Sequence, residues 1–347
     1  MRDQTRQVRS GAKQASMADV AEAAGVSMIT VSRMLRSPDQ VAAQTRARIE
    51  AAMSEVGYVP NLIAGGLAAT RTQLVAAIVP YIQHGVFADS VQGLSDSLTP
   101  KNYCVLLGNS GGSVDEEETI VRTLLGHRPA GLVIQGANHS VKTRQLLSKA
   151  QIPVVEMGTL PDEPINMSVG YSNEAAALAI VQHLISCGRR RIGFIGHASE
   201  TNDRHQRRLR GYMRGLAEAG LAYDQTLLET AEFTIEAGSK AFVRLRERCP
   251  DLDAIFSSSD LWAAGAVFEC QRLGIPVPSD ISICGFNDQE LASQMVPALT
   301  TIQVRRHLIG EIAGDLILKS ISGEEPSSRH VDVGFDLVIR QTTVPYI

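Results

Sequence analysis

One short segment of the sequence, residues 27–36 (SMITVSRMLR), gathers side chains suited to contacting nucleic acid. On a helix, the exposed residues would be Ser27, Met28, Ile29, Thr30, Ser32 and Arg33. The Arg33 guanidinium can bind guanine O6 and N7 as a fork, and Met28 and Ile29 can contact thymine methyl groups. The three hydroxyl groups can hold phosphates, which set the register without reading the sequence. The segment therefore predicts a helix that reads bases in a DNA groove.

Two short helices joined by a tight turn must position these side chains. The apolar residues expected to face inward are Met17, Val20 and Ala21 in the first helix and Val31 and Leu35 in the second. Gly25 lies at the turn, where the absence of a Cβ atom permits a positive φ. Ser27 is placed to cap the second helix. This layout is typical of a helix-turn-helix motif, whose second helix enters the major groove.

A third helix, over residues 43–56, completes the predicted head. Its inward-facing residues, spaced three to four apart, are Ile49, Met53 and Val56. Ala42 precedes this helix and offers no side-chain oxygen, so we expect the helix start to be poorly capped. Gly57 is expected to end the helix, because it can adopt the left-handed conformation of a C-cap.

The motifs DVAEAAGVS, TVSRML and VAAQTRARIEAAMSEVGYVPN, followed by LAATRT, resemble those of the lactose-repressor (LacI) family. The resemblance runs from about Met17 to Val344. Within the family, the stretches MITVSRMLRSPDQV, PVVEMG and FECQRLGIPVP are most similar to the gluconate-operon repressors. The resemblance implies a small all-α helix-turn-helix head and an α/β core. That core would have two subdomains with doubly wound parallel sheets, like a periplasmic binding protein.

Apolar strand-like runs alternate with helical patterns in the rest of the chain, which predicts βαβ units and parallel sheets. These runs are 74–80, 103–108, 131–136, 153–157, 191–196, 253–259, 281–286 and 331–339, with a late helix at 305–320. Residues 1–15 are expected to form a basic disordered leader, or alternatively an arm that contacts DNA. The resemblance implies a head at 16–60, a hinge at 61–72 and an effector-binding, dimerising core at 73–347. The core would divide into about 73–171 with 301–333, and about 172–299 with 334–347. Crossovers would lie near 171–172, 299–301 and 333–335.

Residues 61–72 (NLIAGGLAATRT) form the predicted hinge. In the family this segment becomes a short helix in the DNA minor groove, and Leu67 would be the apolar wedge that opens a base step. The residues expected to line the groove beside it are Asn61, Ala64 and Ala68. Gly65 and Gly66 depart from the family pattern, and each costs about 1 kcal/mol of helix stability relative to alanine. A plain flexible linker is the alternative.

The core is expected to bind a small effector between its subdomains, at the carboxyl ends of the strands. Carried over residue by residue, the resemblance implies an effector site of Phe87, His139, Glu156, Tyr171, Arg208, Phe233, Ser259, Asp260 and Asn287. Arg208 matches the ligand-clamping arginine, whose fork suits hydroxyl pairs or a carboxylate, unless it is a solvated charge. Phe233 would stack on the ligand or belong to the core. Helix capping would explain Ser259 and Asp260 equally well.

Asn287 departs from the family pattern in a way that bears on the ligand. Sugar-binding members carry an aspartate after the aromatic residue of GY or GF, whereas this sequence reads GFND, with Asn287 before Asp288. Loss of one negative charge beside the ligand favours an anionic effector over a neutral one. We therefore expect a sugar acid such as gluconate.

Composition agrees with a globular protein, since 44% of the residues are hydrophobic and 20% are charged. No apolar run is long enough to span a bilayer, and the first sixteen residues lack the apolar core of a secretory signal, so we expect a cytoplasmic protein. The net charge of −4 divides into +3 over residues 1–72 and −7 over the remainder.

The cysteines are Cys104, Cys187, Cys249, Cys270 and Cys284. Without a CxxC pair, they predict buried free thiols rather than a disulfide or zinc site.

These features predict a homodimeric transcription repressor that binds a pseudo-palindromic operator, is controlled by an effector, and needs no metal or cofactor. A periplasmic-type sugar-binding transport protein is the alternative, since it shares the core fold, but it needs a signal peptide and lacks the head. An enzyme is disfavoured, because the sequence has no P-loop, GxSxG, HExxH or GxGxxG motif. GNSGG at 108–112 resembles a protease nucleophile loop, but glycines after a strand are ordinary turn residues.

Overall fold

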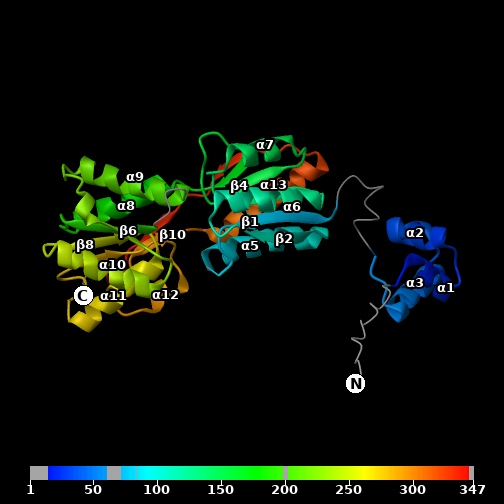
Figure 1. Ribbon diagram of the computed structural model, residues 1–347, viewed down its shortest axis with the longest axis horizontal. Helices are drawn as coiled ribbons and strands as arrows, with labels where there is room; N and C mark the ends of the chain where they lie inside the picture. Colours follow the sequence, from blue (N-terminus) through cyan, green and yellow to red (C-terminus); the bar gives the residue numbers. More distant parts are fainter. Residues whose placement is uncertain (1–14, 61–71, 84, 198–201, 344–347) are drawn as a thin grey trace, which may run out of the picture. The chain divides into compact units, whose positions relative to one another are not determined.

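The computed structural model describes residues 15–60, 72–83, 85–197 and 202–343 (Figure 1). The chain divides into two compact units, residues 1–72 and 73–347. The leader up to residue 14 and the predicted hinge at 61–71 lie outside the described residues. Among the helices that are described, none combines the length and the apolar character that crossing a membrane requires.

The first unit contains α1 (Met17–Ala24), α2 (Met28–Arg36) and α3 (Ala43–Val56), with a 3-10 turn at Pro38–Gln40 between the last two. Ser16 and Asp19 form a capping box at the start of α1. Gly25 ends α1 with a φ of 61°, a left-handed conformation that glycine adopts without steric cost. Ser27 caps α2, as predicted, by accepting a hydrogen bond from the Thr30 amide.

Four of the residues predicted to face inward in the head are half-buried beside the core rather than buried in it: Met17, Leu35, Met53 and Val56. Val20, Val31 and Ile49 are fully buried, but Met34 rather than Leu35 is the second buried residue of α2. Residues three apart therefore face inward here, which is as compatible with a helix as the predicted spacing of four.

The second unit contains two parallel sheets and one short antiparallel ladder. The first sheet has the strand order β11-β5-β4-β3-β1-β2, the second has β7-β6-β8-β9, and β10 pairs with β12. The first group is β1 (Leu74–Val79), β2 (Cys104–Asn109), β3 (Gly131–Gln135), β4 (Val154–Met157), β5 (Met167–Gly170) and β11 (His330–Asp332). The others are β6 (Ile192–His197), β7 (Leu228–Ala231), β8 (Ala254–Ser257), β9 (Ser282–Cys284), β10 (Thr301–Gln303) and β12 (Asp336–Val338).

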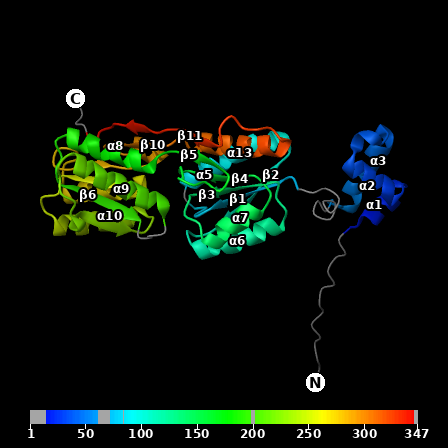
Figure 2. The ribbon, with the colours of Figure 1, turned by 90° about the horizontal axis from the view of Figure 1, so that it is seen from above.

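Helices cover both faces of the first sheet (Figure 2). Val75, Ala77 and Val79 of β1 share a core with α5 and α13, whereas Ala76 and Ile78 share one with α6 and α7. This alternation is the period of two that a strand imposes. These helices are α5 (Gly85–Leu98), α6 (Val114–Gly126), α7 (Val141–Lys149) and α13 (Arg306–Ser322). The remaining helices of the unit are α8 (Asn173–Ser186), α9 (Asp203–Glu218), α10 (Ile235–Arg248), α11 (Asp260–Leu273) and α12 (Glu290–Gln294).

The predicted strands are present, but the structure adds β5, β7 and β10 and divides the run at 331–339. β11 lies in the first sheet and β12 pairs with β10, because Gly334 turns the chain between them with a φ of 67°. All five cysteines are free, and Cys104 and Cys187 depart from the prediction of burial. Cys104 is exposed because it begins β2, the edge strand of the first sheet.

Candidate functional site

The start of α2 presents the predicted DNA-reading residues to solvent. Met28 is 53% exposed and Ile29 is 71% exposed, an unusual position for two adjacent apolar side chains. Ser27 and Arg33 are also exposed, and none of the six predicted α2 residues is buried. The residues predicted to line the minor groove, Asn61, Ala64, Leu67 and Ala68, lie outside the described residues.

All three hydroxyl groups predicted to hold phosphates, those of Ser27, Thr30 and Ser32, already have intramolecular partners. The Ser27 hydroxyl lies 2.9 Å from that of Thr30, and the Ser32 hydroxyl accepts a hydrogen bond of 2.6 Å from Arg36 Nη2. Arg36 was not among the predicted contacts, although its spacing of four from Ser32 places the two on one side of the helix. It adds a second guanidinium beside Arg33 at the surface of α2.

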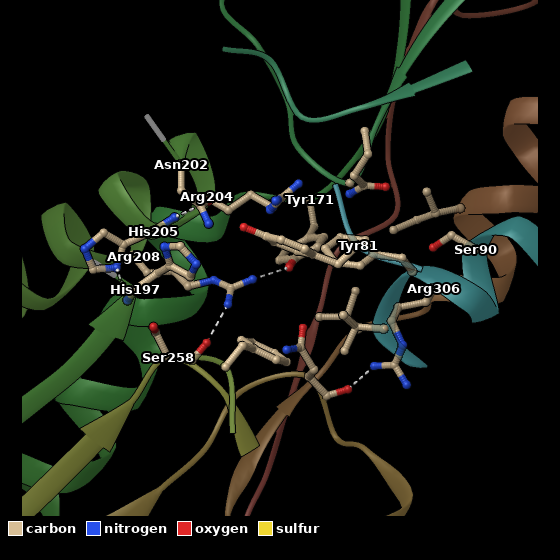
Figure 3. A pocket seen from close by; sticks show the side chains of 18 of the residues that line it. Tyr81, Ser90, Tyr171, His197, Asn202, Arg204, His205, Arg208, Ser258 and Arg306 are labelled. Atoms are coloured by element: carbon tan, nitrogen blue, oxygen red, sulfur yellow. Dashed lines mark hydrogen bonds between the residues drawn. The ribbon is translucent and has the colours of Figure 1, made fainter. Parts of the chain in front are cut away.

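A cavity in the second unit lies where strands of both sheets end (Figure 3). Lining residues at or just after these strand ends are Tyr81, Gln135, Gly158 and Tyr171 in the first sheet and His197, Ser258 and Asn287 in the second. Helices α5, α9 and α13 contribute further residues, among them Phe87, Arg208 and Arg306. This is the place where parallel α/β sheets bind ligands. Of the nine predicted effector residues, five line it: Phe87, Tyr171, Arg208, Phe233 and Asn287.

Arg208 is a buried cation held by uncharged groups. Its Nε donates to Asn173 Oδ1 (2.9 Å), Nη1 to the Ser258 carbonyl (2.7 Å) and Nη2 to the Tyr171 hydroxyl (3.1 Å). Its guanidinium carbon lies 3.7 Å from the centre of the Phe286 ring. Burial without a carboxylate partner lowers the pKa of Arg208, although an arginine keeps its charge at neutral pH. The solvated-charge alternative is therefore excluded by its burial.

The cavity wall is rich in positive charge. Arg204, Arg208, Arg306, His197 and His205 line it, and its described lining residues include no aspartate or glutamate. The guanidinium carbon of Arg204 lies 5.3 Å from the centre of the Phe87 ring, and its buried Nη1 atom has no hydrogen-bond partner within the described part of the chain. An anion entering the cavity would meet several donors and no negative side chain of the described wall.

Burial keeps the two histidines of the cavity neutral. It lowers the pKa of His205 to about 4, and electrostatic interaction with His197 and Arg208 acts in the same direction. Burial and the charge of Arg204 also lower the pKa of His197. A nearby negative charge would oppose these effects, so each ring can take up a proton when an anion binds.

His139 and Glu156 do not line the cavity, which corrects their predicted role. Glu156 lies on β4 two residues after Val154, so it faces α6 and α7 rather than the strand ends. His139 Nδ1 lies 2.8 Å from Glu117 Oε1, and its Nε2 lies 3.5 Å from Glu156 Oε1. Burial alone would lower the pKa of His139, but the two carboxylates raise it to about 9. The three side chains form an internal charged cluster.

Ser259 and Asp260 also lie outside the lining, and both are fully buried. Ser259 caps α11, as the capping alternative proposed. Asp260 Oδ1 accepts a hydrogen bond from the Thr301 hydroxyl (2.6 Å), and Oδ2 accepts one from the Gln289 amide (2.7 Å). Burial raises the pKa of Asp260 to about 6 against these hydrogen bonds. The preceding residue, Ser258, lines the cavity instead.

Sequence reasoning predicted only five of the nineteen described residues of the cavity wall. The missed residues include Tyr81, Gln135, His197, Arg204, His205 and Arg306. A signal for three of them was present, because Tyr81, Gln135 and His197 stand at the ends of predicted strands. Arg204 and His205 could have been found from Arg208, since residues three and four apart share a helix face.

One unit exposes a helix-turn-helix surface, and the other has a cationic cavity between strand ends. Together they define a class of protein: transcription regulators with a periplasmic-binding-protein-like core. A family model of bacterial regulatory proteins of the lacI family matches residues 16–61. A model of the periplasmic binding protein-like domain matches residues 181–343. Both matches agree with the fold class predicted from the motifs.

The regulator GntR of Pseudomonas aeruginosa is 35% identical to this chain over 94% of each. A LacI-family transcriptional regulator from Silicibacter pomeroyi has a similar structure, with a TM-score of 0.90, 33% identity, and 95% of this chain and 99% of that chain covered. The lac repressor dimer bound to operator and an anti-inducer is 25% identical, with a TM-score of 0.81 over 95% of this chain and 99% of that chain. The chain belongs to the lacI family of bacterial regulatory proteins and is a DNA-binding transcriptional regulator.

Proposed function

We propose that this chain represses genes for the use of a sugar acid of the gluconate type, and that the acid controls DNA binding from the core cavity. One observation carries the proposal: the described cavity wall brings together three arginines and two histidines and includes no carboxylate. A ligand carboxylate would supply the negative charge that the buried Arg208 lacks. The similarity to GntR regulators supports the same class of ligand.

Each lining residue has a chemical role in this proposal. Arg208 has five N–H donors and uses three on neighbouring groups, so donors are left for the ligand. Phe87 and Phe233 offer apolar faces to the C–H side of the carbon chain. Asn287 offers an amide, which can donate to a carboxylate or hydroxyl without adding negative charge.

On the DNA side, we propose that α2 reads base edges with Met28, Ile29 and Arg33, and that residues 61–72 act as a hinge with Leu67 as a wedge. A homodimer would place two heads on a pseudo-palindrome, and the operator-bound lac repressor dimer supports this arrangement. The protein would act in the cytoplasm, where bacterial DNA lies, and would have no catalytic role.

Two ligands of equal chain length test the charge argument. Gluconate and sorbitol differ in having a carboxylate or a hydroxymethyl group at one end. We expect gluconate to bind the full chain at least about tenfold more tightly than sorbitol in calorimetry, since a charge-assisted hydrogen bond is worth about 1.5–3 kcal/mol. Gluconate alone should then change the affinity for promoter fragments of the chain's own and neighbouring genes, measured by fluorescence anisotropy.

Two results would contradict the proposal. Equal affinity for the two ligands would contradict an anionic effector. The absence of any promoter preference would contradict the regulatory role. The second result would favour the sugar-binding transport alternative, which shares the core fold. The exposed α2 surface of the head argues against that alternative.

A further inference from the structure

A second hollow adjoins the effector cavity and lies over the start of α6. The two share Tyr81, Gln135, His197, Asn202 and Arg204 as common lining. Figure 3 shows Tyr81 and Arg204 among the side chains that reach into the space between the strand ends. Because five residues line both hollows, the two lie next to each other.

The shared wall carries unused hydrogen-bonding atoms. Gln135 Oε1 and Arg204 Nη1 are both buried and have no hydrogen-bond partner among the residues that the structure describes. Buried polar atoms in folded proteins nearly always have a hydrogen-bond partner, because leaving one without a partner is costly. An acceptor and a donor facing the junction of the two hollows match a ligand hydroxyl, which can give one hydrogen bond and accept another.

The second hollow differs from the first in charge. Glu117 and Asp203 line it, together with Ser110, Ser113 and Asn138. Both carboxylates are fixed by neighbours: Glu117 Oε1 lies 2.8 Å from His139 Nδ1, and Asp203 Oδ2 accepts a hydrogen bond of 3.2 Å from the Ala137 amide. Oriented acceptors of this kind suit neutral hydroxyl groups, whereas a terminal phosphate would face two like charges against the single guanidinium of Arg204.

We propose that this hollow is a second subsite, which takes the hydroxylated tail of an open-chain sugar acid and disfavours a phosphate at its far end. The carboxylate lies among the arginines of the first cavity, and the carbon chain passes Gln135 and Arg204 to reach Glu117 and Asp203. The inference rests on the proposed function, and it adds the length of the ligand and the chemistry of its far end.

A matched pair of valines tests the subsite. Val114 lines the hollow and is the first residue of α6, after its cap Ser113. Val141 is the first residue of α7, after its cap Ser140, and is 72% exposed. Val114→Phe fills the hollow, whereas Val141→Phe makes the same change at an equivalent helix position away from it.

We expect Val114→Phe to weaken gluconate binding by about tenfold, the equivalent of losing one or two hydrogen bonds. Glycerate, which has only three carbons and does not reach the hollow, should lose less than about twofold, and Val141→Phe should change neither affinity. Calorimetry on the full chain measures both affinities, with a competition experiment for the acid that binds more weakly. Equal losses for the two acids, or no loss of gluconate binding, would overturn the subsite and leave the proposed function standing.

A second comparison does not depend on how Val114→Phe folds. The unaltered chain should bind gluconate at least about tenfold more tightly than 6-phosphogluconate, and Asp203→Asn should narrow that difference. Asp162→Asn, at a side chain that is 95% exposed, is the control. Tighter binding of 6-phosphogluconate than of gluconate would overturn the inference. If neither acid binds the unaltered chain, the proposed function and the inference both fail.

Discussion

Arg208 shows how one side chain can define the chemistry of a cavity. It is 9% exposed, yet its hydrogen-bond partners are an amide, a carbonyl and a phenol. A buried charge with neutral partners is stabilised less than one paired with a counter-ion. The stacking on Phe286 compensates in part, since a cation over an aromatic face is favourable. A ligand carboxylate would complete the pairing.

We predict that Arg208→Lys lowers gluconate affinity by at least about tenfold and leaves operator affinity unchanged in the absence of ligand. Lysine keeps the positive charge but loses the planar fork, which costs about 1.4 kcal/mol or more at a bidentate site. Calorimetry and anisotropy measure the two affinities. Arg210→Lys, an exposed neighbour on α9, is the control. An unchanged gluconate affinity would show that the fork is not used.

At Ile29 the prediction concerns sequence preference. Ile29→Gln replaces an exposed apolar side chain by an amide that can bind adenine N6 and N7, so the preferred operator should change. Selection from a randomised DNA library measures the preference, and gluconate affinity should stay the same. Ile339→Gln, at another exposed isoleucine in the other unit, is the control. If the selected operators are the same for all three chains, Ile29 does not read bases.

At the scale of elements, the three helices of the head differ in how they start. Ser16 and Ser27 accept amide hydrogen bonds at the starts of α1 and α2, whereas Ala42 forms none at the start of α3. The first-turn amides of α3 therefore lack the side-chain acceptor that the other two helices have. A different contact fixes α3 in the head. The Arg48 side chain donates a hydrogen bond to the Ala24 carbonyl, which joins α3 to the turn before α2.

Ala42→Ser should stabilise α3. The ψ of Ala42, 139°, is that of an N-cap residue, so a serine there can bond the N2 or N3 amide without rearrangement. A gain of about 1 kcal/mol should slow hydrogen exchange of the α3 amides about fivefold in the full chain. Ala51→Ser, at an exposed interior position of the same helix, should give no protection. Faster exchange in Ala42→Ser would contradict the capping argument.

At the scale of the whole molecule, charge is divided between sites rather than spread evenly. The net charge is −4, yet the described cavity wall is cationic and holds two neutral histidines. Because unfolded His205 takes up a proton near pH 6.5 while the folded residue takes it up only near pH 4, the ligand-free chain should lose stability as the pH falls between these values.

Binding of an anion should reverse this effect. A carboxylate beside His205 and His197 raises their pKa values, so gluconate binding should take up protons and tighten as the pH falls from about 8 to about 5. Calorimetry in buffers of different ionisation enthalpy measures the proton uptake. Sorbitol, which carries no charge, serves as the control ligand. Proton release on gluconate binding, or weaker binding at the lower pH, would contradict the linkage.

By itself the sequence determined the elements and the class of protein. Apolar spacing and caps specify α1 to α3, and runs of apolar residues specify most strands, because both depend on local periodicity. Only the tertiary structure decided which side chains share the cavity. Glu156 and Ser168 are direct partners on β4 and β5, yet neither lines the cavity. Arg306, far along the chain, does. Such proximity depends on how strands and helices pack across long separations, which periodicity along the chain does not encode.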